Sequence, residues 1–223
     1  MSSGEEVFAT ALSHSQPILS VAHSPDNERI ASGGLDRHIY IWDAVSGDKI
    51  AGPLTGHIDG VAAIAYSPDG RKFVSGSWDG SVIIWDSGIG VKISGPFRAH
   101  SSGIRSICYH PAGLNFVVGS DDNTISVWSS STFRPIHSGL RAHRQWISSV
   151  GYSPDGRLII TVSCDRTMRL WDAEIGKVVS GPVGSVQNEN IRHWTAGFSQ
   201  NGIWVASGDI DGTVHIWAVS VLN

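Results

Sequence analysis

The chain has 223 residues and a formal net charge of −4, with 41% hydrophobic residues, 16% charged residues and 26 glycines. This composition excludes a disordered chain, and the acidic balance disfavours nucleic acid as a partner, because phosphate binding needs a strongly basic surface. No apolar run approaches the roughly 20 residues of a membrane span, and two cysteines make no disulfide framework, so we expect a cytoplasmic protein, with the nucleus as the alternative.

The predicted elements begin with a strand at residues 5–11, whose sequence aligns with later segments at 48–54 and 91–97. Internal repeats follow it. Their approximate bounds are 12–53, 54–96, 97–139, 140–182 and 183–220.

Three residue types recur in one register and define these repeats. Tryptophan recurs at 42, 85, 128, 171 and 217, and an aspartate precedes each by six residues, at 36, 79, 122, 165 and 211. Histidine recurs at 14, 57, 100 and 143, in step with the first four tryptophans. The common spacing of 43 residues widens to 46 before the last tryptophan, where an insertion falls within 184–193.

The second repeat shows the local structure that we expect for each copy. Apolar and β-branched stretches predict strands at 61–66, 72–77, 81–86 and 91–96. The turn sequence SPDG (67–70) separates the first strand from the second. The turn sequence WDG (78–80) separates the second strand from the third, and its glycine permits a positive φ. The near-continuous apolar runs indicate strands that are covered on both faces.

The segments GHIDGVAAIAYSPDG (56–70) and SVIIWD (81–86) are similar to those of the WD-repeat family. The resemblance implies an all-β propeller of four-stranded antiparallel blades around a central channel. The tripeptides SGP and AGP (51–53, 94–96, 180–182) also resemble the WD arrays of fungal NACHT-type signalling proteins.

The repeats predict one domain over 1–223, a propeller of five blades. The last repeat lacks a fourth strand of its own, and the strand at 5–11 is available to complete it, which would close the ring. A closed ring predicts a monomer. The alternatives are an oligomer that completes the ring and a fragment of a larger seven-bladed sensor array.

The recurrent polar residues admit two interpretations. A histidine, an aspartate and a hydroxyl suggest a hydrolase triad, but a catalytic set is expected once rather than in every repeat. The family resemblance instead assigns them, with the tryptophans, to a buried hydrogen-bond network. The members of that network are His14, Ser32, Asp36, Trp42, His57, Ser75, Asp79, Trp85, His100, Asp122, Trp128, His143, Thr161, Asp165, Trp171, Ser207, Asp211 and Trp217.

The copies are unequal. In the third repeat Val118 occupies the hydroxyl position, so we expect that network to lack one link. In the fifth, Glu189 occupies the position of the histidine. We therefore predict that the second blade is the most rigid and the fifth the most mobile.

Binding residues are expected at positions that the network does not use. In the WD-repeat family such positions, just before the aspartate and three or five residues after the histidine, face the channel mouth. Three tryptophans outside the repeat pattern fall there, beside two arginines, and both residue types dominate binding hot spots. The predicted partner-binding residues are Leu35, Trp78, Arg105, Asp121, Trp146, Arg192 and Trp194. Trp204 lies away from this face, and we expect it to pack.

We accordingly expect a non-catalytic scaffold that binds other proteins or peptide segments, without nucleic acid, membrane, cofactor or metal. No spacing of histidine and cysteine typical of a metal site occurs, and no phosphate-binding glycine loop. The alternative function is a propeller that binds a small ligand or a glycan.

Overall fold

The structure is a computed structural model that describes residues 13–141, 143–183, 193–209 and 212–219. These residues form five antiparallel sheets, each built from strands that are consecutive in the chain. No helix in these ranges is long and apolar enough to cross a bilayer. The predicted all-β architecture is confirmed.

The sheets are numbered here in chain order. Sheet 1 contains β1 (Ile18–His23), β2 (Arg29–Gly34), β3 (Ile39–Asp43) and β4 (Lys49–Leu54). Sheet 2 contains β5 (Val61–Tyr66), β6 (Lys72–Ser77), β7 (Ser81–Asp86) and β8 (Lys92–Arg98). Sheet 3 contains β9 (Ile104–Tyr109), β10 (Asn115–Ser120), β11 (Thr124–Ser129) and β12 (Pro135–Arg141). Sheet 4 contains β13 (Ile147–Tyr152), β14 (Leu158–Ser163), β15 (Met168–Asp172) and β16 (Lys177–Val183). Sheet 5 contains β17 (His193–Phe198), β18 (Trp204–Asp209) and β19 (Val214–Ala218).

The strands of the second repeat match the sequence prediction except for the last. β8 begins at Lys92 because a turn precedes it, in which the Gly90 N–H donates to the Asp86 carbonyl and the Asp86 N–H to the Val91 carbonyl. The strand continues to Arg98, which pairs with Ser81 of β7. In the WDG turn, Gly80 has the predicted positive φ, at 80°.

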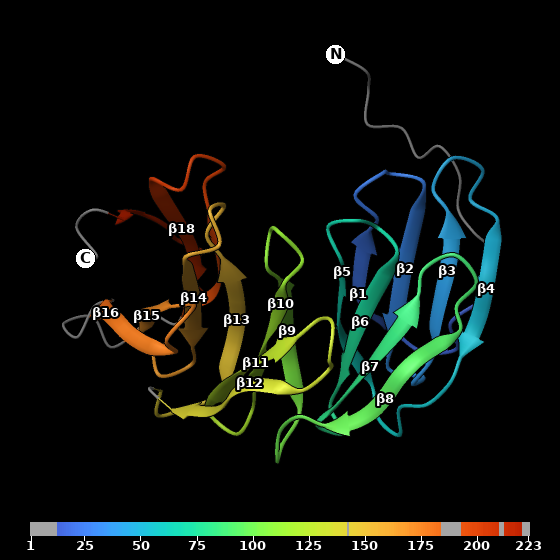
Figure 1. The fold of residues 1–223 in the computed structure, drawn as a ribbon, viewed down its shortest axis with the longest axis horizontal. Helices are drawn as coiled ribbons and strands as arrows, with labels where there is room; N and C mark the ends of the chain where they lie inside the picture. Colours follow the sequence, from blue (N-terminus) through green and yellow to red (C-terminus); the bar gives the residue numbers. More distant parts are fainter. Residues whose placement is uncertain (1–12, 142, 184–192, 210–211, 220–223) are drawn as a thin grey trace.

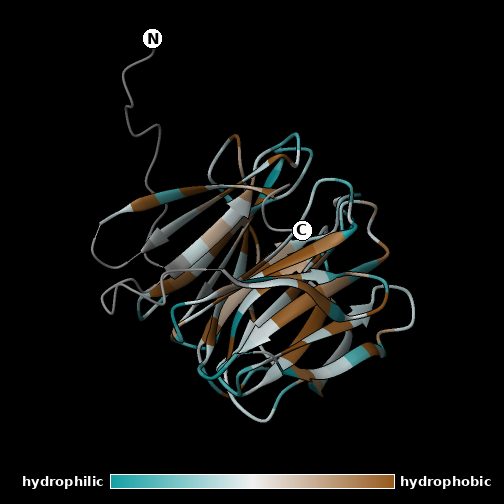
Figure 2. Cartoon of the chain, turned by 90° about the vertical axis from the view of Figure 1, so that its left-hand side faces the viewer, coloured by the Kyte–Doolittle hydropathy of each residue, from teal (hydrophilic) through white to brown (hydrophobic). Residues whose placement is uncertain are grey.

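The core lies between successive sheets. Ile39 and Ile41 of sheet 1 pack against Val61, Ile64 and Phe73 of sheet 2 in one buried cluster. The same arrangement joins sheets 2 and 3, 3 and 4, and 4 and 5. Hydrophobic residues accordingly lie along the strands, and hydrophilic residues at the connecting turns (Figure 2). Stacked in this way, sheets 2, 3 and 4 bury their middle strands on both faces.

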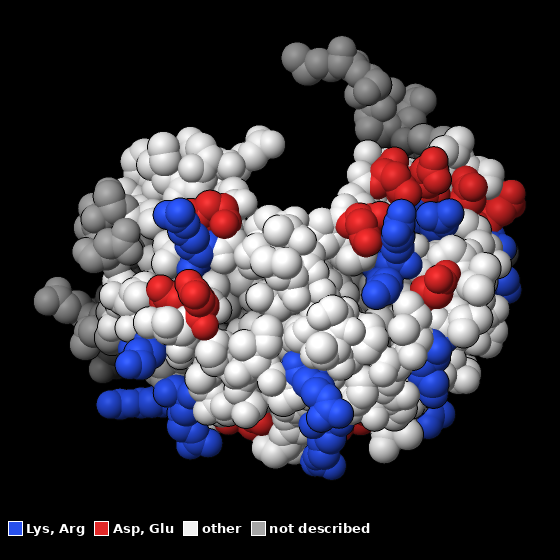
Figure 3. Space-filling model, viewed as in Figure 1, with Lys and Arg blue, Asp and Glu red and all other residues white. Residues whose placement is uncertain are grey.

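The described sheets form an arc rather than a closed ring (Figure 1). Contacts between first strands run from β1 to β5, β9, β13 and β17 in order, while sheets 1 and 5 stand at the two ends of the arc. The space-filling view shows a hollow between these ends (Figure 3). The closing strand predicted at 5–11 lies outside the described residues, and within them sheet 5 has three strands.

Trp204 corrects one expectation. It begins β18 and is nearly half-exposed instead of packed in the core. The reason is its position beside Ala206 and Ile216 in an open apolar groove on sheet 5, which no further described sheet covers.

Candidate functional site

The recurrent polar residues form hydrogen-bonded chains within the sheets. In sheet 4 His143 Nδ1 lies 3.1 Å from Asp165 Oδ2, and Nε2 lies 2.8 Å from the Thr161 hydroxyl. That hydroxyl also accepts a hydrogen bond from Trp171 Nε1 at 2.9 Å. Because a carboxylate only accepts, the imidazole carries its proton on Nδ1 and accepts the hydroxyl proton at Nε2. Each buried polar atom in this chain therefore has a partner.

Sheet 1 repeats this geometry with His14, Asp36, Ser32 and Trp42. The ring Nδ1 lies 3.0 Å from either carboxylate oxygen, and the Ser32 hydroxyl lies 2.9 Å from both His14 Nε2 and Trp42 Nε1. In sheet 5 Trp217 Nε1 donates to the Ser207 hydroxyl at 3.1 Å, while Asp211 lies outside the described residues.

Sheet 2 contains an additional hydroxyl that the sequence analysis did not identify. His57 Nδ1 lies 2.9 Å from the Ser81 hydroxyl and 3.5 Å from Asp79 Oδ2. The other end of the chain is unchanged, with Ser75 bonded to His57 Nε2 at 2.7 Å and to Trp85 Nε1 at 2.8 Å. Hydroxyl residues recur at this place, two after the aspartate, as Thr124 and Thr167. That 43-residue recurrence was the signal that could have found them.

The expectation that the third network lacks one link is wrong. The Ser126 hydroxyl lies 2.7 Å from His100 Nε2 and accepts from Trp128 Nε1 at 2.8 Å. Ser126 is on β11, directly opposite Val118 on β10, so a hydroxyl at either position reaches the same two nitrogens. The sequence comparison considered only the position of Val118 and missed the strand across from it.

The surroundings of the carboxylates hold them ionised. Burial alone would raise the pKa of Asp165, but hydrogen bonds from the His143 ring, the Thr167 hydroxyl and the Arg144 backbone outweigh it, and the pKa lies well below its usual value. The pKa values of Asp36, Asp79 and Asp122 are lowered in the same way. Burial lowers the pKa of His100 and keeps that ring neutral, against the opposing effect of Asp122.

The two sets of predicted binding positions are neighbours in the fold. In four sheets the residue before the aspartate donates its backbone N–H to the carbonyl of the residue three after the histidine. These pairs are Leu35 with Pro17, Trp78 with Gly60, Asp121 with Gly103, and Cys164 with Trp146, at 2.8–3.1 Å. One backbone contact per sheet thus places both positions at the same end of the strands.

Four of the predicted binding residues meet in what we call the tryptophan–arginine cluster, Trp78, Arg105, Asp121 and Trp146. Arg105 Nε and Nη2 donate to the two carboxylate oxygens of Asp121 at 2.7 and 3.2 Å. The guanidinium carbon lies 4.6 Å from the Trp146 ring centroid and 5.7 Å from that of Trp78. A two-point ion pair and cation–π contacts therefore hold side chains from sheets 2, 3 and 4 together.

Leu35 extends this cluster towards sheet 1. A side chain at Gly60 would meet Leu35 Cδ1 and Trp78 Cε3, each at 3.2 Å, so these two residues flank one glycine. Arg192 and the side chain of Trp194 lie outside the described residues. The structure therefore brings together five of the seven predicted binding residues along one end of the sheets.

A scan against protein-family models matches the description WD domain, G-beta repeat, at residues 6–43, 49–86, 91–129, 133–172 and 180–218. These matches span most of the chain. The chain belongs to the WD-repeat family. A search of curated proteins found no match.

WD-repeat domains generally mediate interactions with other proteins or peptides, and they are typically non-catalytic. Among the residues that the structure describes, no group of three or more His, Cys, Asp and Glu is placed to hold a metal ion.

Proposed function

We propose that this WD-repeat protein is a non-catalytic scaffold that binds a protein segment at the tryptophan–arginine cluster. The observation that carries the proposal is that the Arg105 guanidinium lies over the rings of both Trp78 and Trp146. None of these residues belongs to the hydrogen-bonded chains that stabilise the sheets. Their side chains are only partly buried, so they are available to a partner.

The chemistry of the cluster favours an apolar or aromatic anchor on the partner. Asp121 neutralises the Arg105 guanidinium, and the pair is partly exposed, so an anionic ligand would compete with an existing carboxylate. The two indole rings are held by contacts with the Arg105 guanidinium, so they lose little conformational entropy when a partner binds.

The hydroxyl groups argue against a hydrolase. Ser75 and Thr161 are fully buried, and each hydroxyl is already shared between a histidine and an indole. A nucleophile needs access to its substrate, and burial denies these two hydroxyls that access. We therefore propose that these residues serve the fold and that the protein acts, in a reducing compartment such as the cytoplasm, through binding alone.

A random peptide library selected against the purified protein tests this proposal. Affinities of the selected peptides are then measured by calorimetry for the wild type, W78A/W146A and R105A. We expect the variants to bind at least about tenfold more weakly, a loss of about 1.4 kcal/mol. The matched control is W204A, which removes an exposed indole outside the cluster and should leave the affinity for the selected peptides unchanged.

Two outcomes would overturn the proposal. One is a set of peptides whose affinity is unchanged in W78A/W146A while thermal unfolding shows the fold intact. The other is a selection that yields no peptide, together with a glycan on an array that binds the wild type but not W78A/W146A. That result would assign the site to a sugar.

A further inference from the structure

A polar pocket of about 400 Å³ lies between the outer strands of sheets 2 and 3. Its walls come from the end of β8, the loop that follows β8, the turn before β11 and the end of β12. β8 and β12 are the last strands of their sheets and lie on the outer side of the arc (Figure 1). The pocket is therefore separate from the indole rings of the tryptophan–arginine cluster and from both ends of the arc.

Two arginines, one repeat apart, flank this pocket. Arg98 and Arg141 are the last residues of β8 and β12, and both are exposed. Arg98 pairs with Ser81 of β7 and Arg141 with Thr124 of β11, so the two strands end in the same register. No acid among the described residues forms an ion pair with either arginine. The pocket therefore lies between two cations that no described carboxylate neutralises.

The two guanidinium groups keep most of their hydrogen-bond donors. Arg98 Nη2 donates to the Ser101 carbonyl at 3.1 Å, which holds this side chain against the loop after β8. Within the part of the chain that the structure describes, this is the one side-chain hydrogen bond that either arginine makes. Each guanidinium has several N–H donors in a planar fork that matches a carboxylate or a phosphate. An anionic group in the pocket can therefore accept hydrogen bonds from both arginines.

The acid in the wall of the pocket, Asp122, is already engaged. Its Oδ2 accepts from the Ser101 backbone N–H at 3.0 Å and from the Ser101 hydroxyl at 3.2 Å. Its Oδ1 accepts from the Thr124 hydroxyl at 2.6 Å, and both oxygens lie within 3.2 Å of His100 Nδ1. These bonds fix the carboxylate in the wall, where its side chain is 15% exposed. Two arginines against one acid leave the pocket with a net positive charge.

Gly139 opens the pocket on the side of β12. The other four-stranded sheets have proline at this place, as Pro53, Pro96 and Pro182. The register is the same, because in all four sheets the next residue pairs with the third strand. Gly139 has a φ of 62°, which proline cannot adopt, and a Cβ built there would meet no atom within 4 Å. Sheet 3 is therefore open where the other sheets have a ring.

The pocket and the tryptophan–arginine cluster share two segments. Asp121 pairs with Arg105 in the cluster, and the next residue, Asp122, lines the pocket. The loop of residues 99–103 lines the pocket at its start, and at its end the Gly103 carbonyl accepts from the Asp121 N–H at 2.8 Å. The first and fourth strands of a sheet are about 14 Å apart, which an extended peptide covers in about four residues. One bound segment can therefore reach both places.

We propose that this pocket binds an anionic side chain, a carboxylate or a phosphate, of the protein segment that binds the tryptophan–arginine cluster. Arg98 and Arg141 bind the anion from its two sides. The anionic residue lies about four residues from the residue that contacts the indole rings. This inference rests on the proposed function for the kind of partner, whereas binding of an anion in the pocket does not depend on it.

Titration with inorganic phosphate, and separately with acetate, tests the pocket without any partner. Backbone amide NMR of the wild type should show saturable shifts at Ser101, Thr124 and Gly139, which line the pocket. The response should weaken as sodium chloride is added, because salt screens exposed charges. The anion with the larger response identifies which of the two groups the pocket prefers.

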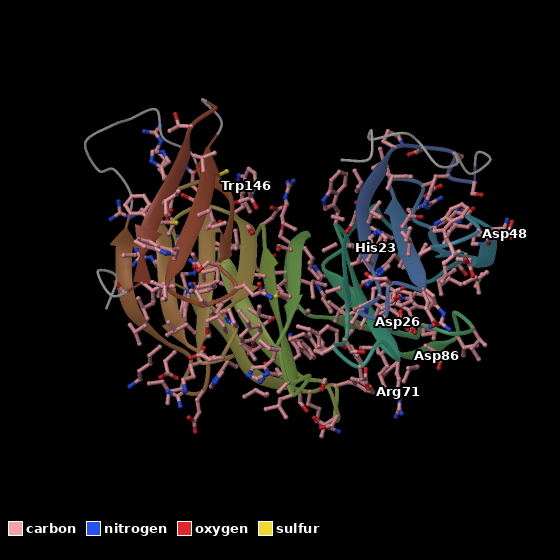
Figure 4. All side chains as sticks on the ribbon, turned by 90° about the horizontal axis from the view of Figure 1, so that it is seen from above. His23, Asp26, Asp48, Arg71, Asp86 and Trp146 are labelled. Carbon is pink, nitrogen blue, oxygen red and sulfur yellow. The ribbon has the colours of Figure 1, made fainter. Side chains whose placement is uncertain are left out.

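The decisive variant is R98M/R141M, which removes both charges and keeps the aliphatic stems. We expect the anion-dependent shifts to disappear, while circular dichroism and thermal unfolding show the fold intact, because both side chains are exposed. The matched control is R71M/R134M, which removes two other exposed arginines and should keep the shifts. Figure 4 shows Arg71 well away from Trp146, the labelled member of the cluster.

Peptides selected against the wild type give the second result. We expect an aspartate or glutamate about four residues from an apolar or aromatic residue. Replacing that acid by its amide should weaken binding at least about tenfold in the wild type and leave it unchanged in R98M/R141M. Phosphoserine at the same place distinguishes the two sources, since tighter binding assigns the pocket to phosphate and weaker binding to carboxylate.

Two results would overturn the inference. The first is a wild type whose pocket amides do not respond to either anion, or respond equally in R98M/R141M. The second is a set of peptides that W78A/W146A weakens and R98M/R141M does not, which would leave the proposed function intact. Peptides with the reverse dependence would instead overturn the proposed function and keep the anion pocket.

Discussion

Ser126 on β11 faces Val118 on β10, and its hydroxyl bonds to both the His100 ring and the Trp128 indole. Sheet 2 has the reverse arrangement, with Ser75 on the second strand opposite Ile83 on the third. Both residues of each pair are fully buried, so exchanging them keeps one hydroxyl and one aliphatic side chain in the same volume. The network needs the hydroxyl near two nitrogens, and either strand can supply it.

This relationship predicts a strong coupling between positions 118 and 126. Ser126→Val should destabilise the fold by about 1–3 kcal/mol for each buried nitrogen left unpaired. Val118→Ser alone should also be destabilising, because it buries a second hydroxyl in an apolar cluster. The double variant should recover most of the loss, as judged by urea unfolding. Additive single effects would contradict the exchange, and the exposed Ser131→Val should stay within about 0.5 kcal/mol of the wild type.

The lowered pKa of Asp165 predicts a defined loss of stability in acid. A folded-state pKa below the unfolded value of 3.8 stabilises the fold above that value, and this contribution is lost as the pH falls towards the folded pKa. Asp165→Asn should therefore lower the free energy of unfolding at pH 7, by about 1–3 kcal/mol. Urea unfolding as a function of pH should show a constant difference between the two proteins above pH 3.8, and a difference that narrows below pH 3.8 as the pH approaches the folded pKa. A difference that stays constant below pH 3.8 would refute the assignment.

The close packing at Gly119 predicts that a single added methyl group disrupts an interface. Gly119→Ala places Cβ 2.8 Å from two side chains of sheet 4, Ile147 and Val150, which must move. Overpacking of this kind costs about 1–3 kcal/mol. The matched control is Gly197→Ala on β17, the first strand of sheet 5, because no atom lies within 4 Å of a Cβ built there. Thermal unfolding should show a lower melting temperature for Gly119→Ala than for Gly197→Ala. An equal loss in both variants would rule out the packing explanation.

Amide hydrogen exchange should differ most between sheets 2 and 5. Sheet 2 is packed on both faces, by sheets 1 and 3, whereas sheet 5 contacts only sheet 4 among the described residues. We expect the slowest exchange in β6 and β7 and the fastest in β18 and β19. Hydrogen–deuterium exchange of the wild-type protein, read by mass spectrometry, gives these rates. If sheet 5 were then the best protected part, the prediction would fail.

Most of the fold could be predicted from the sequence. The spacing of Trp42, Trp85, Trp128 and Trp171 defines the repeat, and the apolar stretches before and after each turn predict the strands. These signals are local and recur, so errors at one copy are corrected by the others. The end of β8 was not predicted, because it depends on pairing of Arg98 with Ser81 rather than on hydrophobicity.

The candidate site was predicted only as positions. The repeat register placed Trp78, Arg105 and Trp146 at one end of the sheets, but not in contact. Whether the guanidinium reaches both rings depends on the angle between successive sheets and on the ion pair with Asp121. Neither can be read from spacing along the chain.

The sequence by itself determined the repeat, the strands and the residue types of the polar network, because a periodic pattern of apolar and polar side chains specifies local structure. Only the tertiary structure decided that Ser126 replaces the hydroxyl absent at Val118, since that depends on the register between two strands. It also decided that Ile18 and Ile216 are largely exposed on faces that no other described sheet covers, since exposure depends on how the sheets are placed around the arc.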